Sequence, residues 1–205
     1  MTRYINLVVG FLVLLLLFFT ASLDGGFWWS DAPRHALNGV FLKDALFDFP
    51  IDAPKEYAIE YYKQYPALTI LFYPPLFPAV ESLFYMVFGV HVWIPVLVVM
   101  VFYAVTLIFA YKILSRHFDQ GMAMILSLIF ILLPEMAEWG RQVMLEIPAY
   151  ALVLVSVYFY LLYVEENKLG RLLLAVLFLA AAMLSKFLNS PDTTSGTKIN
   201  KFFNH

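Results

Sequence analysis

Apolar residues occur in long runs separated by short polar segments, and this pattern predicts the architecture of the chain. A helix needs about 20 residues to cross a hydrocarbon core of roughly 30 Å, and the runs approach that length with few internal charges. We therefore predict an all-α membrane protein with about five transmembrane helices. They lie at about residues 5–23, 92–114, 121–136, 147–164 and 170–187.

The first run follows a basic residue, Arg3, and this arrangement also fits a secretory signal peptide. The apolar stretch at residues 5–23 is longer than the hydrophobic part of a signal peptide, which has about 7 to 15 residues. We therefore interpret it as a helix that stays in the membrane.

A sixth apolar stretch lies at residues 74–90, and whether it crosses the membrane determines on which side every later loop lies. It contains three prolines and Glu81, and lipid cannot replace the backbone hydrogen bonds that proline removes. If it lies on the outer surface, the lysines and arginines at 112–119 and 165–171 are cytoplasmic, as the positive-inside rule requires. We therefore predict a multi-pass protein of the cytoplasmic (inner) membrane, with its amino terminus inside and the loop 24–91 outside.

The long outer loop is rich in aromatic residues, which is not typical of a disordered segment. We predict interfacial helices in it at about residues 31–47, 54–65 and 74–90. Residues 1–187 then form one transmembrane module. Residues 188–205 are polar and rich in turn-forming residues, so we predict a disordered tail on a truncated or frameshifted product that is inactive alone.

The composition excludes several classes of function. Hydrophobic residues make up 62% and charged residues 14%, with a mean hydropathy of +0.79, whereas about a quarter of a soluble domain is charged. The 13 Lys and Arg are outnumbered by 15 Asp and Glu, so no basic excess predicts a nucleic-acid partner. The absence of cysteine excludes thiolate metal sites, disulfides and cysteine nucleophiles. No cofactor is predicted, and the pattern does not indicate a divalent metal.

Polar residues that follow the first predicted span form the first candidate site. At helical spacing Asp31, Arg34, His35 and Asn38 share one face after a capping Ser30. A carboxylate in the first turn is stabilised by the helix dipole and can act as a base. The alternative is that Asp31 caps the helix and forms an ordinary surface pair with Arg34. The opposite face, which can lie on lipid, carries Leu37, Val40, Phe41 and Ala45.

Three further charged residues lie at predicted span ends on the outer side. Arg141 and Glu146 precede and open the fourth span, and Lys186 closes the fifth. Arg141 and Glu146 would point about 140° apart on one regular helix, so they converge only if the chain bends between them. A cation at headgroup depth suits a lipid-linked phosphate. The alternative is that all three are ordinary interfacial charges.

Four short motifs follow one another along the chain. Residues 29–35 read Trp-Ser-Asp-Ala-Pro-Arg-His, and residues 73–76 read Tyr-Pro-Pro-Leu before a stretch that ends in Phe-Gly. Arg141 then precedes Glu146, and the fifth span closes on Lys186. In this order and spacing the chain resembles the C-type (GT-C) integral-membrane glycosyltransferases. The similar branch is glycosyltransferase family 39 and the aminoarabinose-transferase-like enzymes, which include the protein O-mannosyltransferases.

The resemblance implies a transferase that takes a sugar from a polyprenyl-phosphate donor and passes it to a protein, lipid or glycan acceptor on the outer face. It implies that Asp31 is the catalytic carboxylate, which polarises the acceptor hydroxyl. It further implies that Glu146 shapes the sugar or acceptor pocket. It also implies that Arg141 and Lys186 hold the phosphate of the donor or leaving group. The remaining candidates for binding substrate or phosphate are Arg34 and His35.

Three positions depart from the usual pattern of this family. A second carboxylate often follows the first, where this chain has Ala32, and Asp is more common than Glu at the position of Glu146. A basic residue often precedes the Pro-Pro pair, where this chain has Tyr73.

Two other interpretations remain. A non-enzymatic membrane component, such as a transporter fragment or an assembly subunit, would use the outer carboxylates as ion or partner contacts. The predicted spans have no charges in their centres, which favours chemistry at the interface over conduction. An oligosaccharyltransferase-like enzyme would need several acids around a metal, and the first motif contains a single Asp, Asp31.

Overall fold

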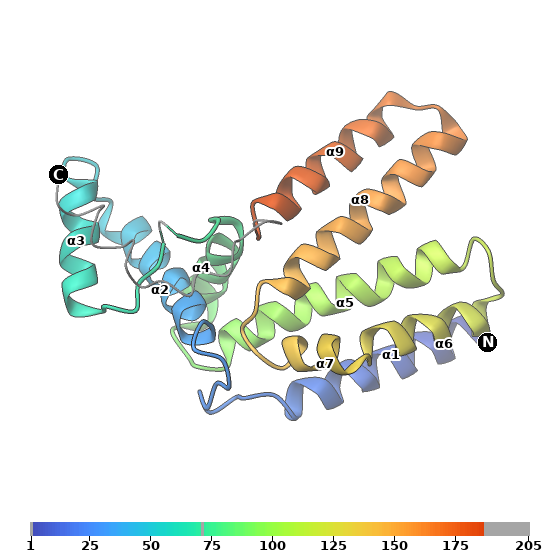
Figure 1. Ribbon diagram of the computed structural model, residues 1–205, viewed down its shortest axis with the longest axis horizontal. Helices are drawn as coiled ribbons and strands as arrows, with labels where there is room; N and C mark the ends of the chain where they lie inside the picture. The colour runs from blue at the N-terminus through green and yellow to red at the C-terminus, as the bar shows by residue number, and fades with distance from the viewer. Residues whose placement is uncertain (1, 71, 187–205) are drawn as a thin grey trace.

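The structure is a computed structural model, and it describes residues 2–70 and 72–186 (Figure 1). In this part of the chain every regular element is a helix, which confirms the predicted all-α fold. The predicted tail at residues 188–205 lies outside the described residues. The helices are α1 (Thr2–Phe19), α2 (Ala32–Asp48), α3 (Pro54–Gln64), α4 (Leu76–Phe88), α5 (Ile94–Leu114), α6 (Gln120–Ile131), α7 (Pro134–Gly140), α8 (Glu146–Glu166) and α9 (Leu169–Met183).

The helices form two groups, which Figure 1 shows side by side. Helices α1, α5, α6, α8 and α9 run alongside one another as an elongated bundle. Helices α2, α3 and α4 lie beyond one end of this bundle and are called the outer group below. Helix α5 is central, because it contacts α1, α4, α6, α7 and α8. Its side chains Ile94, Val98 and Tyr103 are fully buried, as are Phe77 of α4 and Ile147 of α8. The core therefore extends from the bundle into the outer group through α4.

Two described helices are long and apolar enough to cross a membrane by themselves, namely α5 and α8 with 21 residues each. Helices α6 and α7 together would make a third crossing, bent by 70°. Helix α9 and the apolar part of α1 are shorter than a full crossing. The five predicted crossings therefore remain a prediction.

The bend between α6 and α7 differs from the straight span predicted at residues 121–136. Helix α6 ends at Ile131, and Leu133 adopts an extended conformation, with φ −52° and ψ 137°. The cause is Pro134, because a proline disfavours the helical conformation in the residue before it. The Tyr103 hydroxyl donates a hydrogen bond to the Ile131 carbonyl, which supplies a partner to an oxygen at the interrupted helix end.

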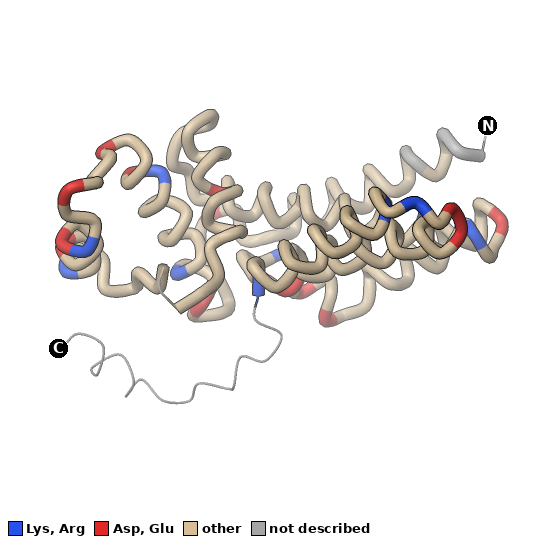
Figure 2. Tube along the Cα trace, turned by 90° about the horizontal axis from the view of Figure 1, so that it is seen from above, with Lys and Arg blue, Asp and Glu red and all other residues tan. Residues whose placement is uncertain are grey.

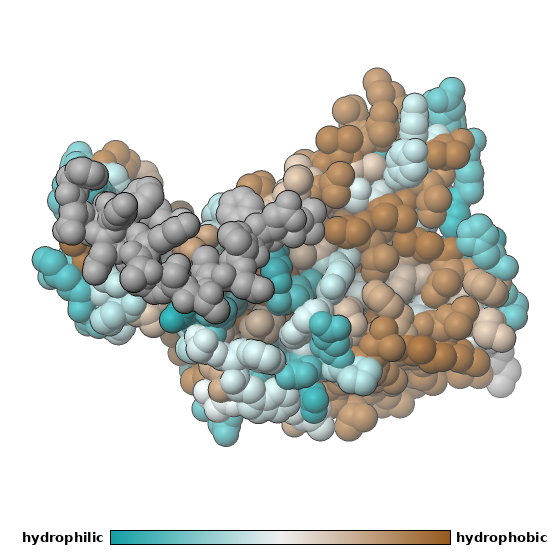
Figure 3. Space-filling model, in the orientation of Figure 1, coloured by the Kyte–Doolittle hydropathy of each residue, from teal (hydrophilic) through white to brown (hydrophobic). Residues whose placement is uncertain are grey.

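Charged residues gather at the two ends of the bundle and on the outer group, whereas the middle of the bundle is uncharged (Figure 2). Figure 3 shows the same division, with brown hydrophobic residues covering most of the bundle surface. At the end farthest from α2, Arg116 pairs with Glu165, and Arg171 lies 3.6 Å from a carboxylate oxygen of Glu166. This distribution is typical of helices that place their centres in lipid and their ends in water.

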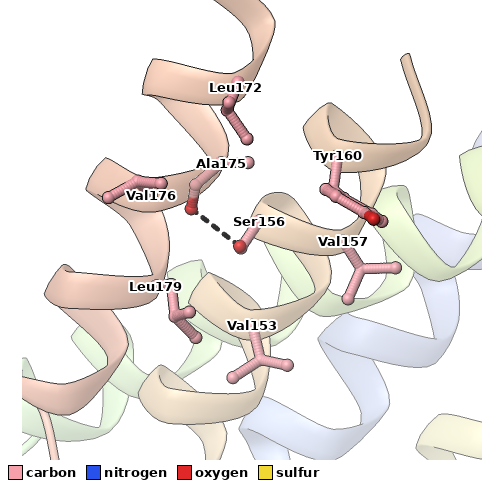
Figure 4. A pocket seen from close by; sticks show the side chains of 8 residues that line it. All are labelled: Val153, Ser156, Val157, Tyr160, Leu172, Ala175, Val176 and Leu179. Carbon is pink, nitrogen blue, oxygen red and sulfur yellow. Dashed lines mark hydrogen bonds between the residues drawn. The ribbon is translucent and has the colours of Figure 1, made fainter. Parts of the chain in front are cut away.

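Helices α8 and α9 enclose a shallow apolar groove on the bundle surface (Figure 4). Its lining includes Val153, Val157, Val176 and Leu179. The Ser156 hydroxyl donates a 2.7 Å hydrogen bond to the Ala175 carbonyl, so the one short polar side chain in the groove is bonded to backbone. Small residues of this kind allow membrane helices to approach each other closely.

Helix α2 does not present its whole apolar face to lipid, contrary to the sequence prediction. Phe41 is buried, and its ring lies 5.0 Å from that of Tyr61 in α3. On the predicted polar face Asn38 is also buried, and its side-chain oxygen accepts a 2.9 Å hydrogen bond from the Thr69 backbone. Gly39 packs directly against Glu81 of α4. Because α2 is covered by α3, α4 and the intervening loop, its orientation is determined by these contacts.

Candidate functional site

Asp31 lies at the amino-terminal end of α2, where its carboxylate remains accessible. It occupies the cap position that the sequence analysis assigned to Ser30, but it has helical backbone angles and forms no side-chain capping bond. One carboxylate oxygen lies 3.3 Å from an Arg34 nitrogen, and the two side chains are 40% and 45% exposed. The predicted pair is therefore present, and the Asp31 carboxylate is not used to cap the helix.

Glu146 and Lys186 form a second charged pair. Glu146 is the first residue of α8, and Lys186 follows α9, so the close packing of these two helices brings together residues that are 40 positions apart. The Lys186 Nζ donates a 2.5 Å hydrogen bond to Glu146 Oε1. The Glu146 side chain is 14% exposed and that of Lys186 is 37% exposed, so the ammonium group is the more accessible partner.

A backbone hydrogen bond connects the Lys186 segment with α4. The amide of Leu76, the first residue of α4, donates to the Leu184 carbonyl over 3.1 Å. This bond places the end of α9 beside the Pro-Pro segment that begins at Pro74. The second charged pair thereby reaches the outer group of helices.

His35 lies between the two charged pairs. The side chain is buried, and burial lowers its pKa to about 4; the nearby Asp31 carboxylate opposes this shift, whereas the positive charges of Lys186 and Arg34 reinforce it. His35 is therefore neutral near pH 7. Its Nδ1 is buried without a hydrogen-bond partner. The charges of Asp31 and Lys186 thus both act on His35, with opposite effects on its pKa.

Tyr73 packs against His35 and is affected by the charges of the same residues. Its ring meets that of His35 edge to face, with centroids 4.5 Å apart. Burial raises the pKa of Tyr73 to about 12, and the negative charges of Asp31 and Glu146 add to the increase, whereas the positive charge of Arg34 opposes it. The Tyr73 hydroxyl is therefore protonated near pH 7.

Tyr73 was missed as a site residue by the sequence analysis. The only signal was its position directly before the Pro-Pro pair, where the sequence analysis treated it as a departure from the family pattern. Tyr73 is one of 13 tyrosines, and nothing else in the neighbouring sequence indicates which residues it contacts.

Arg141 belongs to a separate contact between the loop that follows α1 and the turn that follows α7. Its guanidinium lies over the ring of Trp28, 5.2 Å from the centroid, and its Nε donates to the Ala137 carbonyl. Glu146 pairs with Lys186, so the bend after α7 directs Arg141 and Glu146 to different partners. Arg141 therefore reaches the first loop through an aromatic ring and not through a carboxylate.

Gln142 is a second residue that the sequence analysis did not select. It is fully buried, its Nε2 donates to the Ser22 hydroxyl over 2.7 Å, and its Oε1 accepts a 2.9 Å hydrogen bond from the Trp28 amide. These bonds hold the first outer loop, where it leaves α1, against the turn between α7 and α8. Asp31 is three residues beyond Trp28, so Gln142 helps to position the segment that leads to it.

The site combines an accessible carboxylate, two accessible cations and a protonated phenol. Asp31 can accept a proton or a hydrogen bond, whereas Arg34 and Lys186 can hold anionic oxygens. No group of three or more acids and histidines within the described ranges 2–70 and 72–186 is arranged to hold a metal ion. The arrangement is suited to bringing a hydroxyl and a phosphate together at the end of a membrane helix bundle.

Comparison with protein families gives a match. The family model described as dolichyl-phosphate-mannose-protein mannosyltransferase matches residues 73–190, which is more than half of the chain. The match begins at Tyr73 and includes Arg141, Glu146 and Lys186, but it does not extend to Asp31. No curated protein and no solved structure matches the chain.

Proposed function

Because the chain belongs to the dolichyl-phosphate-mannose-protein mannosyltransferase family, and so to the membrane glycosyltransferases of the GT-C type, we propose that it transfers a sugar, such as mannose, from a polyprenyl-phosphate carrier. The acceptor would be a protein, lipid or glycan hydroxyl on the outer face of the membrane. One observation supports the proposal, namely that the charges of Asp31 and of the Glu146–Lys186 pair both act on the packed rings of His35 and Tyr73.

The proposed reaction is a displacement at the anomeric carbon of the sugar. The acceptor oxygen forms a bond to that carbon, and the bond from carbon to the carrier phosphate oxygen breaks. Asp31 accepts the proton of the acceptor hydroxyl, and the bonding electron pair leaves with the phosphate. A carboxylate on one side and cations on the other side match the charges that develop in this transition state.

The cations have the role of binding the phosphate. Lys186 is accessible and is oriented by Glu146, while Arg34 offers several parallel donors beside Asp31. Arg141, on the ring of Trp28, is positioned to contact phosphate that lies along the second outer loop. His35 is neutral and contributes shape and hydrogen bonding to the substrate site.

Donor binding is the first test. The chain is placed in lipid nanodiscs, and binding of polyprenyl-phosphate-mannose is measured by native mass spectrometry, with the free polyprenol for comparison. We expect Lys186→Met to weaken donor binding by roughly tenfold or more, because a charge-assisted hydrogen bond to phosphate is lost. Lys168→Met, at the other end of the bundle, is the control. Equal donor binding by Lys186→Met and the unmodified chain would contradict the phosphate role.

Lys186→Met also leaves Glu146 without its partner, so a second variant separates the two effects. The double variant Lys186→Met with Glu146→Gln removes both charges. We expect it to bind donor as weakly as Lys186→Met, because phosphate needs the ammonium group. Recovery of binding in the double variant would instead assign the loss to an unpaired carboxylate.

Sugar transfer is the second test. We expect Asp31→Asn to reduce turnover by about 100-fold or more while donor binding is retained, because the amide cannot accept the proton. Asp52→Asn, in the exposed turn before α3, is the matched control. Full turnover by Asp31→Asn would remove Asp31 from the reaction. Specific donor binding without transfer to any acceptor would favour a non-enzymatic membrane component.

A further inference from the structure

Arg141 is a half-buried cation without a carboxylate partner. Among the residues that the structure describes, no ion pair involves it. Its Nε donates a 3.1 Å hydrogen bond to the Ala137 carbonyl, and its guanidinium lies over the ring of Trp28. These contacts restrain the direction of the guanidinium and leave its positive charge unneutralised. A cation held in this way is suited to an anionic oxygen from outside the chain.

Trp28 supplies the ring on which Arg141 rests, and the position of this residue is fixed by its backbone. Trp28 is 54% exposed, so packing restrains it little. Its amide donates a 2.9 Å hydrogen bond to Oε1 of Gln142, which is fully buried. A main-chain amide can only donate, so the bond also defines which end of the Gln142 side chain faces Trp28. Trp28 is therefore held by the residue that follows Arg141 in the sequence.

The other end of the Gln142 side chain completes a ring of contacts that returns to Arg141. Its Nε2 donates a 2.7 Å hydrogen bond to the hydroxyl of Ser22, which is also buried. The Ser22 amide in turn donates over 3.4 Å to the carbonyl of Arg141. The backbone and the guanidinium of Arg141 thus both contact the loop that follows α1. Gln142 joins the two points of contact, Ser22 and Trp28.

This ring of contacts connects two parts of the chain that are far apart in the sequence. Arg141 and Gln142 belong to the family match at residues 73–190, whereas the loop that follows α1 precedes it. Asp31 comes three residues after Trp28 in this loop. The contacts therefore link the arginine of the matched region to the segment that leads to Asp31.

We infer that Trp28 and Gln142 are positioning residues, which hold the Arg141 guanidinium in the orientation that binds a phosphate oxygen of the lipid-linked donor. The inference rests on the proposed function, because that function supplies the phosphate. A long side chain that is already held in its binding conformation loses less entropy when the ligand binds. Removal of the Trp28 ring should therefore weaken phosphate binding although the cation itself is retained.

The contacts are tested first, without a ligand. The four tryptophans are replaced by 5-fluorotryptophan, and ¹⁹F spectra of the chain in nanodiscs are recorded. The Trp28 resonance is the one that Trp28→Phe removes. We expect both Arg141→Met and Ser22→Ala to move it, because the first removes the cation over the ring and the second removes a bond that orients Gln142. Ser156→Ala, which removes a buried and hydrogen-bonded hydroxyl in α8, should leave it in place. A Trp28 resonance that is indifferent to either of the first two changes would overturn the inference.

Binding of polyprenyl phosphate, the carrier without its sugar, is then measured by native mass spectrometry, with free polyprenol for comparison. We expect Arg141→Met to weaken phosphate binding roughly tenfold and Trp28→Leu roughly threefold or more, with polyprenol binding unchanged. Trp28→Tyr keeps an aromatic face under the guanidinium, so it should bind within about twofold of the unmodified chain. Trp93→Leu, which removes an indole directly before α5, is the matched control. Unchanged phosphate binding by Trp28→Leu would overturn the inference.

A double variant separates positioning from a general structural role. If Trp28 acts through Arg141, adding Trp28→Leu to Arg141→Met should change phosphate binding by less than about twofold, because no guanidinium is left to position. Losses that multiply in the double variant would show that Trp28 acts independently of Arg141, and the positioning role would be refuted.

The outcomes for this inference and for the proposed function are distinguishable. If Lys186→Met weakens phosphate binding and Arg141→Met does not, the proposed function stands and the role of Trp28 and Gln142 is refuted. If the unmodified chain binds polyprenyl phosphate no better than polyprenol, the proposed function fails, and the inference fails with it.

Discussion

Glu81 is an ionisable residue in an unusual environment. It lies fully buried in α4, both carboxylate oxygens lack a hydrogen-bond partner, and it packs against Gly39. Burial raises the pKa of Glu81 well above its usual value of 4.5. The raised pKa favours the protonated form of Glu81 in the folded chain, and burial of its unpartnered carboxyl destabilises the contact between α2 and α4.

We expect Glu81→Met to stabilise the protein by about 1 to 3 kcal/mol, because an unpartnered polar group is replaced by an apolar side chain of similar size. Glu81→Gln, which stays polar and cannot ionise, should gain less. Thermal unfolding of the chain in nanodiscs measures the difference. A lower midpoint for Glu81→Met than for the unmodified chain would show that Glu81 has a partner.

The difference in stability between Glu81→Met and the unmodified chain is expected to depend on pH. Above about pH 4.5 the unfolded chain releases the Glu81 proton while the folded chain keeps it, so stability falls as the pH rises. The fall is at most about 1.4 kcal/mol per pH unit, until the folded group also ionises. We therefore expect the advantage of Glu81→Met to grow from about pH 5 to about pH 7. A constant difference would contradict the raised pKa.

The packing of α2 on α4 is the contact between elements that places Asp31 and His35. Gly39 faces α4 so closely that an added Cβ would lie 2.6 Å from Glu81. Gly170, near the start of α9, has no atom within 4 Å of such a Cβ. The same substitution therefore has opposite expected effects in the two helices.

We expect Gly39→Ala to destabilise the protein by about 1 to 3 kcal/mol, because the two helices must move apart. Gly170→Ala should be neutral or stabilising by up to about 1 kcal/mol, because alanine favours the helix and meets no neighbour. The unfolding midpoints of both variants are measured under one set of conditions. Equal effects would show that α2 and α4 are not in close contact.

The molecule as a whole is divided into an apolar bundle and a polar outer group, and this division makes a prediction about topology. The chain contains no cysteine, so single cysteines report on one position each. Three exposed residues suit this purpose: Glu56 in α3, Glu135 in the first turn of α7, and Lys168 directly before α9.

We expect Glu56→Cys and Glu135→Cys to react in intact cells with a maleimide that cannot cross membranes, and Lys168→Cys to react only after the membrane is opened. This pattern follows from the distribution of lysine and arginine in the short loops. Protection of Glu56→Cys or Glu135→Cys in intact cells would invert the assigned orientation, and with it the face on which the proposed transfer occurs.

Much of the helical structure was predictable because its signals are local. The periodicity after the first span predicted a helix at residues 31–47, where the structure has α2 (Ala32–Asp48), and the same holds for α3 and α4. The bend before α7 was not predicted, although the sequence contains Pro134 there. The apolar run continues up to this proline, and hydrophobicity alone does not show where a helix bends. The lipid-facing assignment of Phe41 was wrong, because periodicity identifies an apolar face but not what covers it.

The candidate site was predictable in its residue types and not in its connections. Composition and charge order alone established a membrane chain whose acids and cations lie at helix ends, since hydrophobicity and charge act on each segment independently of the others. The packing of α8 on α9 and of α2 on α4 decided three features: the pairing of Lys186 with Glu146, the separation of Glu146 from Arg141, and the contact of Tyr73 with His35. These contacts join residues tens of positions apart, and no short stretch of chain encodes which helix will lie beside it.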